Sequence, residues 1–151
     1  MRSGQLSRRG FTMIELTIVM VIIGITAAIA VPRIGQAVAG ERTRRATTEV
    51  ATFFEYAFGV ASRTSSPVTV QFVPATGTLE LADRSSGNVI RRLPLQASSE
   101  YQFQNVTFTP AGAVVVFPNG MASAAMALNI SNTSGLSKTI TASRVGQVRE
   151  Q

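Results

Sequence analysis

One run of this chain is long and apolar enough to cross a membrane as a helix. Between Phe11 and Val31 the only ionisable side chain is Glu15, and the remaining polar groups are three threonine hydroxyls. A helix needs about 20 such residues to span roughly 30 Å of hydrocarbon. Arg8 and Arg9 precede the run, and this order predicts a cytoplasmic N-terminus with the rest of the chain outside.

Glu15 is the residue that a plain membrane anchor does not explain. An acidic residue at the bilayer centre costs roughly 2.5 to 3.5 kcal/mol on insertion scales, so it normally faces a partner. The natural partner is a positive group on a neighbouring copy. The carboxylate therefore points to assembly, with a plain anchor as one alternative.

A secretory signal peptide is a second alternative. Arg8 and Arg9 then form its basic region, Met13 to Ile25 its apolar region, and Ala28-Ile29-Ala30 a small-residue cleavage site that leaves a mature chain beginning at Val31. The carboxylate at the start of the apolar region does not fit this interpretation.

The residues around Glu15 match a more specific pattern. The stretch Gly10-Phe11-Thr12-Met13-Ile14-Glu15 resembles the processing site of type IV pilins and type II secretion pseudopilins, and Gly24 and Pro32 fall where that family commonly has them. The resemblance implies that a membrane aspartyl peptidase, the prepilin peptidase, cuts between Gly10 and Phe11, and that Phe11 is then N-methylated. Residues 1–10 are then a leader peptide.

The resemblance implies that Glu15 sets the register between neighbouring subunits. The new amine of Phe11 on one subunit is expected to pair with Glu15 of its neighbour. Such a pair satisfies both charges in a low dielectric, whereas loss of one partner leaves an uncompensated charge.

A helix is expected to continue beyond the apolar run. Residues 11–32 form the transmembrane and assembly segment, with Gly24 and Pro32 favouring a kink, and residues 33–63 form an amphipathic half. The apolar residues of that half recur every three or four positions, which predicts a stripe that packs on a sheet. They are Ala46, Val50, Phe53, Phe54, Ala57, Val60 and Ala61.

Residues 64–151 read as a β domain. Short alternating runs separated by Gly, Pro and Asn turns predict the strands of an antiparallel β-sheet domain. The expected strands are 68–72, 78–82, 89–95, 101–108, 113–117, 124–130, 138–142 and 145–148. A helix followed by strands gives an α+β fold, in which the long helix packs on the sheet.

This C-terminal layout resembles the GspH/FimT-like minor pilins. Their pattern includes segments such as Phe108-Thr109-Pro110-Ala111-Gly112 and Ala127-Leu128-Asn129-Ile130. Some FimT-like proteins capture DNA through a C-terminal Gly-Arg-x-Arg pattern. Here Gln147 replaces the first arginine, so only Arg144 and Arg149 remain as candidate phosphate contacts. The simpler interpretation is that these arginines keep a strand edge soluble.

Composition argues against catalysis. The chain has no Cys and no His, which removes thiolate nucleophiles, disulfides and the usual general base. Glu80 and Asp83 are close in sequence but lack the ligand spacing of a calcium loop. No cofactor, metal site or enzymatic activity is therefore expected. The sequence predicts a structural subunit of a pilus or secretion pseudopilus, with other subunits, the peptidase and an inner-membrane assembly platform as partners.

Overall fold

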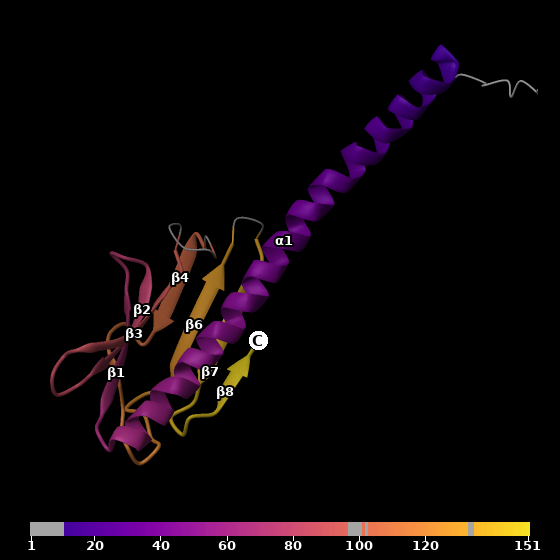
Figure 1. The fold of residues 1–151 in the computed structure, drawn as a ribbon. Coiled ribbons are helices and arrows are strands. Elements are labelled where there is room, and N and C mark those ends of the chain that lie inside the picture. Colours follow the sequence, from indigo (N-terminus) through magenta and orange to yellow (C-terminus); the bar gives the residue numbers. More distant parts are fainter. Residues whose placement is uncertain (1–10, 97–100, 102, 133–134) are drawn as a thin grey trace, which may run out of the picture. The chain divides into compact units, whose positions relative to one another are not determined.

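The computed structural model describes residues 11–96, 101, 103–132 and 135–151 of the chain. It divides into two compact units, Met1–Ala37 and Val38–Gln151. The described part of the first unit is occupied by the N-terminal part of helix α1, Met13–Thr64, which continues into the second unit. The eight strands of the described residues all lie in the second unit (Figure 1).

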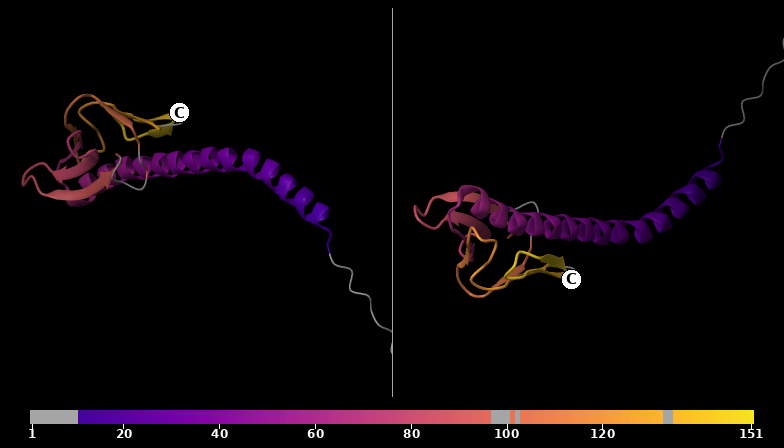
Figure 2. Two further views of the ribbon diagram at one scale, coloured as in Figure 1. Left: turned by 90° about the horizontal axis from the view of Figure 1, so that it is seen from above. Right: turned by 90° about the horizontal axis from the view of Figure 1, so that it is seen from below.

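The C-terminal part of α1 supplies one wall of the core. The apolar stripe predicted from the sequence is buried in full, from Ala46 to Ala61, and both views in Figure 2 show strands alongside this part of the helix. Two threonines also face inward, and the hydroxyls of Thr43 and Thr47 donate to the carbonyls of Ala39 (2.9 Å) and Thr43 (2.8 Å). Buried hydroxyls are tolerated there because the helix backbone satisfies them.

The first sheet has the order β3-β2-β1-β5 and is antiparallel throughout. Its strands are β1 Val68–Val73, β2 Thr78–Asp83, β3 Val89–Pro94 and β5 Val114–Val116. Val70 lies opposite Leu81 on β2 and Val114 on β5, and all three are fully buried. The alternation in the sequence therefore gives the sheet one inward face.

The second sheet has the order β4-β6-β7-β8 and is also antiparallel. Its strands are β4 Asn105–Thr109, β6 Met126–Ser131, β7 Ser137–Ala142 and β8 Val148–Glu150. Leu128 and Ile140 lie opposite each other and are fully buried. The inward residues of both sheets and of α1 belong to one hydrophobic cluster.

The predicted antiparallel arrangement is confirmed, and the strands form two sheets. The strand after β4 does not pair with β4; β5 instead returns to β1, and β4 pairs with β6. A period-two pattern shows which side chains face inward, but it does not show which strands are neighbours. The division into two sheets therefore depends on long-range pairing that the pattern leaves open.

Two predicted strands begin three or more residues before the observed ones, whereas the bounds of the others agree to within two residues. Residues 145–148 were expected to form a strand, but residues 144–146 lie in a turn and β8 begins only at Val148. Gly146 adopts φ = 79°, a left-handed conformation that turns favour and strands do not. The strand expected over 101–108 begins at Asn105, while Phe103 forms an isolated parallel bridge with Gln96.

Candidate processing and assembly site

Helix α1 begins with a reciprocal capping arrangement. Thr12 donates to Glu15 Oε2 from its backbone N–H (2.9 Å) and from its hydroxyl (3.1 Å), and the backbone N–H of Glu15 donates to Thr12 Oγ1 (3.3 Å). This is a capping box, in which side chains three residues apart satisfy the free backbone donors at a helix start. It holds the Glu15 carboxylate at the first turn, three residues from Thr12 and four from Phe11.

The rest of the N-terminal segment presents its apolar side chains outward. Every residue from Phe11 to Ala37 is exposed, and Phe11 itself is 89 % exposed. By length and composition α1 is a helix that can cross a membrane. A soluble protein rarely leaves so many adjacent apolar side chains uncovered, so a membrane or neighbouring helices are the expected surroundings.

The other residues predicted for this site lie in or before the same helix. Gly24 and Pro32 are both inside α1, which is helical through Pro32; a kink at these positions stays a prediction. Beyond the backbone of its own helix, a Cβ at Gly24 would meet no described atom within 4 Å. Gly10, on the leader side of the expected cut, lies outside the described residues.

Arg144 and Arg149, the candidate DNA contacts, occupy different structural settings. The Nε–H of Arg144 donates to the carbonyl of Ala122 (3.3 Å), which ties the turn before β8 to the loop before β6. Arg149 is on β8, opposite Thr141, and lines a hollow of about 450 Å³ together with Thr109 and Gln147. Arg144 does not line that hollow, and a nucleic-acid role for the two arginines stays a prediction.

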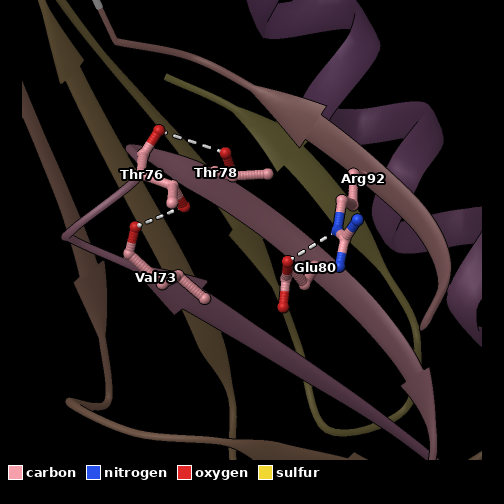
Figure 3. A network of polar contacts seen from close by, with 5 residues as sticks. All are labelled: Val73, Thr76, Thr78, Glu80 and Arg92. Carbon is pink, nitrogen blue, oxygen red and sulfur yellow. Dashed lines mark hydrogen bonds and ion pairs between the residues drawn. The ribbon is translucent and has the colours of Figure 1, made fainter. Parts of the chain in front are cut away.

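Glu80 and Asp83 are the carboxylates that were considered as metal ligands. Glu80 forms an ion pair with a neighbouring side chain, and Asp83 accepts hydrogen bonds from neighbouring groups. Figure 3 shows Glu80 facing Arg92, whose Nε lies 2.8 Å from Glu80 Oε1. Asp83 Oδ1 accepts from the hydroxyl of Ser85 (2.5 Å) and from the backbone N–H of Ser86 (2.8 Å). These bonds, with that of the Ser85 hydroxyl contributing most, lower the pKa of Asp83 from 3.8 to about 2. Within the described ranges no group of three or more potential metal ligands occurs.

Two polar contacts were missed in the sequence. The contact between Thr12 and Glu15 is predictable from the sequence, since Thr-x-x-Glu before an apolar run is the capping-box pattern. The bond from the Tyr101 hydroxyl to Glu49 Oε2 has no such signal, because it joins residues 52 positions apart. Tyr101 also stacks on the buried Phe103, with ring centroids 6.1 Å apart.

Comparison with known proteins supports this assignment of the N-terminal segment. Residues 6–31 match the family described as the prokaryotic N-terminal methylation motif. The match spans the predicted cleavage site, the capping box and most of the apolar run. No curated protein matches the chain in sequence.

Solved structures match the fold. A crystal structure of the type IV minor pilin FimU of Pseudomonas aeruginosa covers 72 % of this chain and 91 % of its own, at 14 % identity and a TM-score of 0.56. A second crystal form of FimU covers 74 % and 89 %, at 15 % identity and the same TM-score.

A pseudopilin has a similar structure. The minor pseudopilin EpsH from the type 2 secretion system of Vibrio cholerae covers 73 % of this chain and 96 % of its own, at 12 % identity and a TM-score of 0.51. At such identities the likeness establishes the fold, a long helix with antiparallel sheets. The chain therefore carries an N-terminal methylation motif and shares its fold with a type IV minor pilin and a minor pseudopilin of a type 2 secretion system.

Proposed function

We propose that this protein is a structural subunit of a type IV pilus or type II secretion pseudopilus, of the minor, GspH/FimT-like kind. The observation that carries the proposal is the coincidence of three features in one segment. The methylation motif covers residues 6–31, the apolar helix there is exposed along its length, and its single carboxylate, Glu15, lies at the helix start. The work of such a subunit is mechanical, and no catalytic step is assigned to it.

Processing provides the assembly contact. Prepilin peptidase cuts between Gly10 and Phe11, and the new amine of Phe11 is methylated. The capping box supports this role because it keeps Glu15 at the end of the helix, on the turn where a neighbouring amine can reach it. In the filament that amine replaces part of the Thr12 hydrogen bonding as partner of the carboxylate, which sets the register between subunits.

The membrane segment explains the route to the filament. Residues 11–32 hold the precursor in the bacterial inner membrane, with the leader in the cytoplasm and the β domain in the periplasm. An inner-membrane assembly platform then extracts the subunit, and the exposed apolar surface moves from lipid to the helices of other subunits. Both environments cover the same side chains, so the transfer does not expose them to water.

The test is the mass of the mature N-terminal peptide, from cells with and without a prepilin peptidase. The expected product begins at Phe11 and carries one methyl group only when the peptidase is present. A product that begins at Val31 in both strains would establish a secreted domain released by signal peptidase, and an uncut chain in both would establish a plain membrane anchor.

Replacement of Glu15 by Ala separates processing from assembly. We expect normal insertion and cleavage but loss of incorporation into filaments, because the Phe11 amine of the neighbour is left without its partner. Glu15→Asp is the matched variant, since it keeps the charge but shortens the side chain. Full incorporation of Glu15→Ala would contradict the proposed register role.

A further inference from the structure

Among the asparagines of the chain, Asn119 alone is followed by a glycine, Gly120. Each of the others precedes a β-branched residue: Asn88, Asn105, Asn129 and Asn132 are followed by Val, Val, Ile and Thr. The backbone nitrogen after an asparagine can react with its side-chain amide when the two groups meet. A β-branched side chain obstructs that approach, whereas glycine does not. The sequence therefore selects Asn119 for a reaction with its own backbone.

The loop between β5 and β6 holds the Asn119 side chain close to the following peptide group. Asn119 is exposed, and its Oδ1 accepts a hydrogen bond from the backbone N–H of Met121 (3.1 Å). This bond makes an Asx turn, in which the side chain folds back along the backbone. The side-chain carbonyl carbon of Asn119 therefore lies along the peptide group that contains the Gly120 nitrogen.

The same loop restrains the nitrogen that would react. The N–H of Gly120 donates to the carbonyl of Phe117 (3.1 Å), and the N–H of Phe117 donates to the carbonyl of Met121 (2.8 Å). The Gly120 nitrogen must lose its proton before it forms a new bond, and a donated hydrogen bond opposes that loss. The folded loop thus orients the carbon that is attacked and restrains the nitrogen that attacks it.

We propose that Asn119 is a modification site, at which the side-chain amide is lost when the loop opens locally. The Gly120 nitrogen bonds to the side-chain carbonyl carbon of Asn119, which closes an imide ring, and the bond from that carbon to the side-chain nitrogen breaks. The amide group leaves as ammonia with the proton from Gly120. Water then opens the ring at one of its two carbonyl carbons, and the product is aspartate or isoaspartate.

The two products differ in their effect on the loop. Aspartate keeps the backbone length, and its carboxylate can still accept the Met121 N–H. Isoaspartate routes the backbone through the former side chain and so adds a methylene between Phe117 and Met121. Those residues are joined by a hydrogen bond, and Val116 and Ala122 form a bridge just outside them. The added length is therefore expected to disrupt this end of β5.

The modification needs only water, so it does not depend on the proposed function. The test is to incubate the full chain in detergent micelles and in concentrated urea at one pH, and to follow each asparagine by mass spectrometry of its peptide. We expect conversion at Asn119 before any other asparagine. The folded chain is expected to react roughly two- to tenfold more slowly than the chain in urea, the effect of a hydrogen bond that must open first.

The pH dependence gives a further expectation. The rate is expected to increase with pH in both conditions, because the Gly120 nitrogen reacts after losing its proton. Faster conversion at another asparagine would overturn the assignment of the site. Equal rates in micelles and in urea would overturn the control by the loop.

Two serine variants of the full chain are matched. Asn119→Ser removes the amide and leaves a hydroxyl that can accept the same Met121 N–H. Asn105→Ser is the control, because Asn105 is also exposed but precedes Val106. We expect the first variant to abolish the main mass change and the second to leave it unaltered. A main mass change that persists in Asn119→Ser would contradict the proposal.

The Asn119→Asp variant separates the effects of the two products. It reproduces the aspartate product, and we expect it to unfold at nearly the same urea concentration as the parent chain. The isoaspartate form, separated from the incubated chain by chromatography, is expected to unfold at a lower concentration. Equal midpoints for the two forms would overturn the proposed disruption of the loop.

Discussion

At the scale of single residues, Thr12 does more than occupy a position in a processing motif. Its hydroxyl and backbone both bind the Glu15 carboxylate, and its hydroxyl accepts the Glu15 N–H. A carboxylate held in this way is satisfied before any neighbouring subunit arrives. The Thr12 donors therefore lower the cost of placing the Glu15 carboxylate in an apolar environment, although among the described residues its charge has no cationic partner.

Replacing Thr12 by Val tests this role, because it removes the hydroxyl and keeps the shape. Loss of an N-cap side chain costs about 0.5 to 2 kcal/mol, so the amide of Glu15 is expected to exchange its hydrogen faster by roughly 2- to 30-fold. The measurement is hydrogen exchange of the full chain in detergent micelles. Thr12→Ser keeps the hydroxyl and is the control; equal exchange in both variants would contradict a cap.

We expect the stability of the folded chain to depend on pH through the ionisation of Asp83. Its pKa is lowered to about 2 in the folded chain, so its contribution to stability is complete above the unfolded value of about 3.8 and is lost as the pH falls toward 2. The Asp83→Asn variant is expected to be less stable than the parent near neutral pH and to lose less stability between pH 4 and pH 2. The check is denaturant unfolding of both chains at several pH values, and parallel profiles would refute the assignment.

At the scale of elements, the turn between β7 and β8 packs directly on α1. A Cβ at Gly146 would lie 3.3 Å from Cδ1 of Phe58, and Gly146 adopts φ = 79°. This turn therefore needs glycine for two reasons, its left-handed backbone and the closeness of the helix.

Comparison of Gly146→Ala with Gly120→Ala separates the effect of the left-handed backbone from the effect of the contact with α1. Gly120 has φ = 78°, and a Cβ there would meet nothing within 4 Å. Both variants are expected to lose about 1 to 2 kcal/mol from the left-handed conformation, and Gly146→Ala is expected to lose more because Phe58 must also move. Urea unfolding of the full chain measures the difference. A smaller loss at Gly146 than at Gly120 would show that the contact with Phe58 is unimportant.

At the scale of the whole molecule, the two units differ in whether their side chains are buried. The buried residues lie between Thr43 and Ala142, all within Val38–Gln151. The described residues of Met1–Ala37 bury none of their side chains. One unit carries the stable core, and the other carries the surface that membrane or filament must cover.

Removal of residues 1–37 is therefore expected to leave a soluble, folded domain, since no core residue is lost. We expect a single monomeric peak in gel filtration without detergent and a cooperative thermal transition. The full chain is expected to need detergent, because its apolar helix is exposed from residue 11 onward. Precipitation of the shortened chain would mean that the N-terminal unit supports the fold.

Much of this molecule follows from local patterns in the sequence. The length of the apolar run, the inward stripe from Ala46 to Ala61 and most strand positions are determined by periodicity and turn residues, because these depend on neighbours a few residues apart. The candidate processing site is likewise a short contiguous motif. Thr12 belongs with these local features, although its role became visible only in the hydrogen bonds of the structure.

Only the tertiary structure decided how the strands divide between two sheets and which distant residues are in contact. The pairing of β5 with β1, the bond from Tyr101 to Glu49 and the closeness of Gly146 to Phe58 join segments far apart in the chain. The free energy of forming these contacts depends on closing long loops around a shared core. A pattern among residues that are neighbours in the sequence contains no information on such contacts.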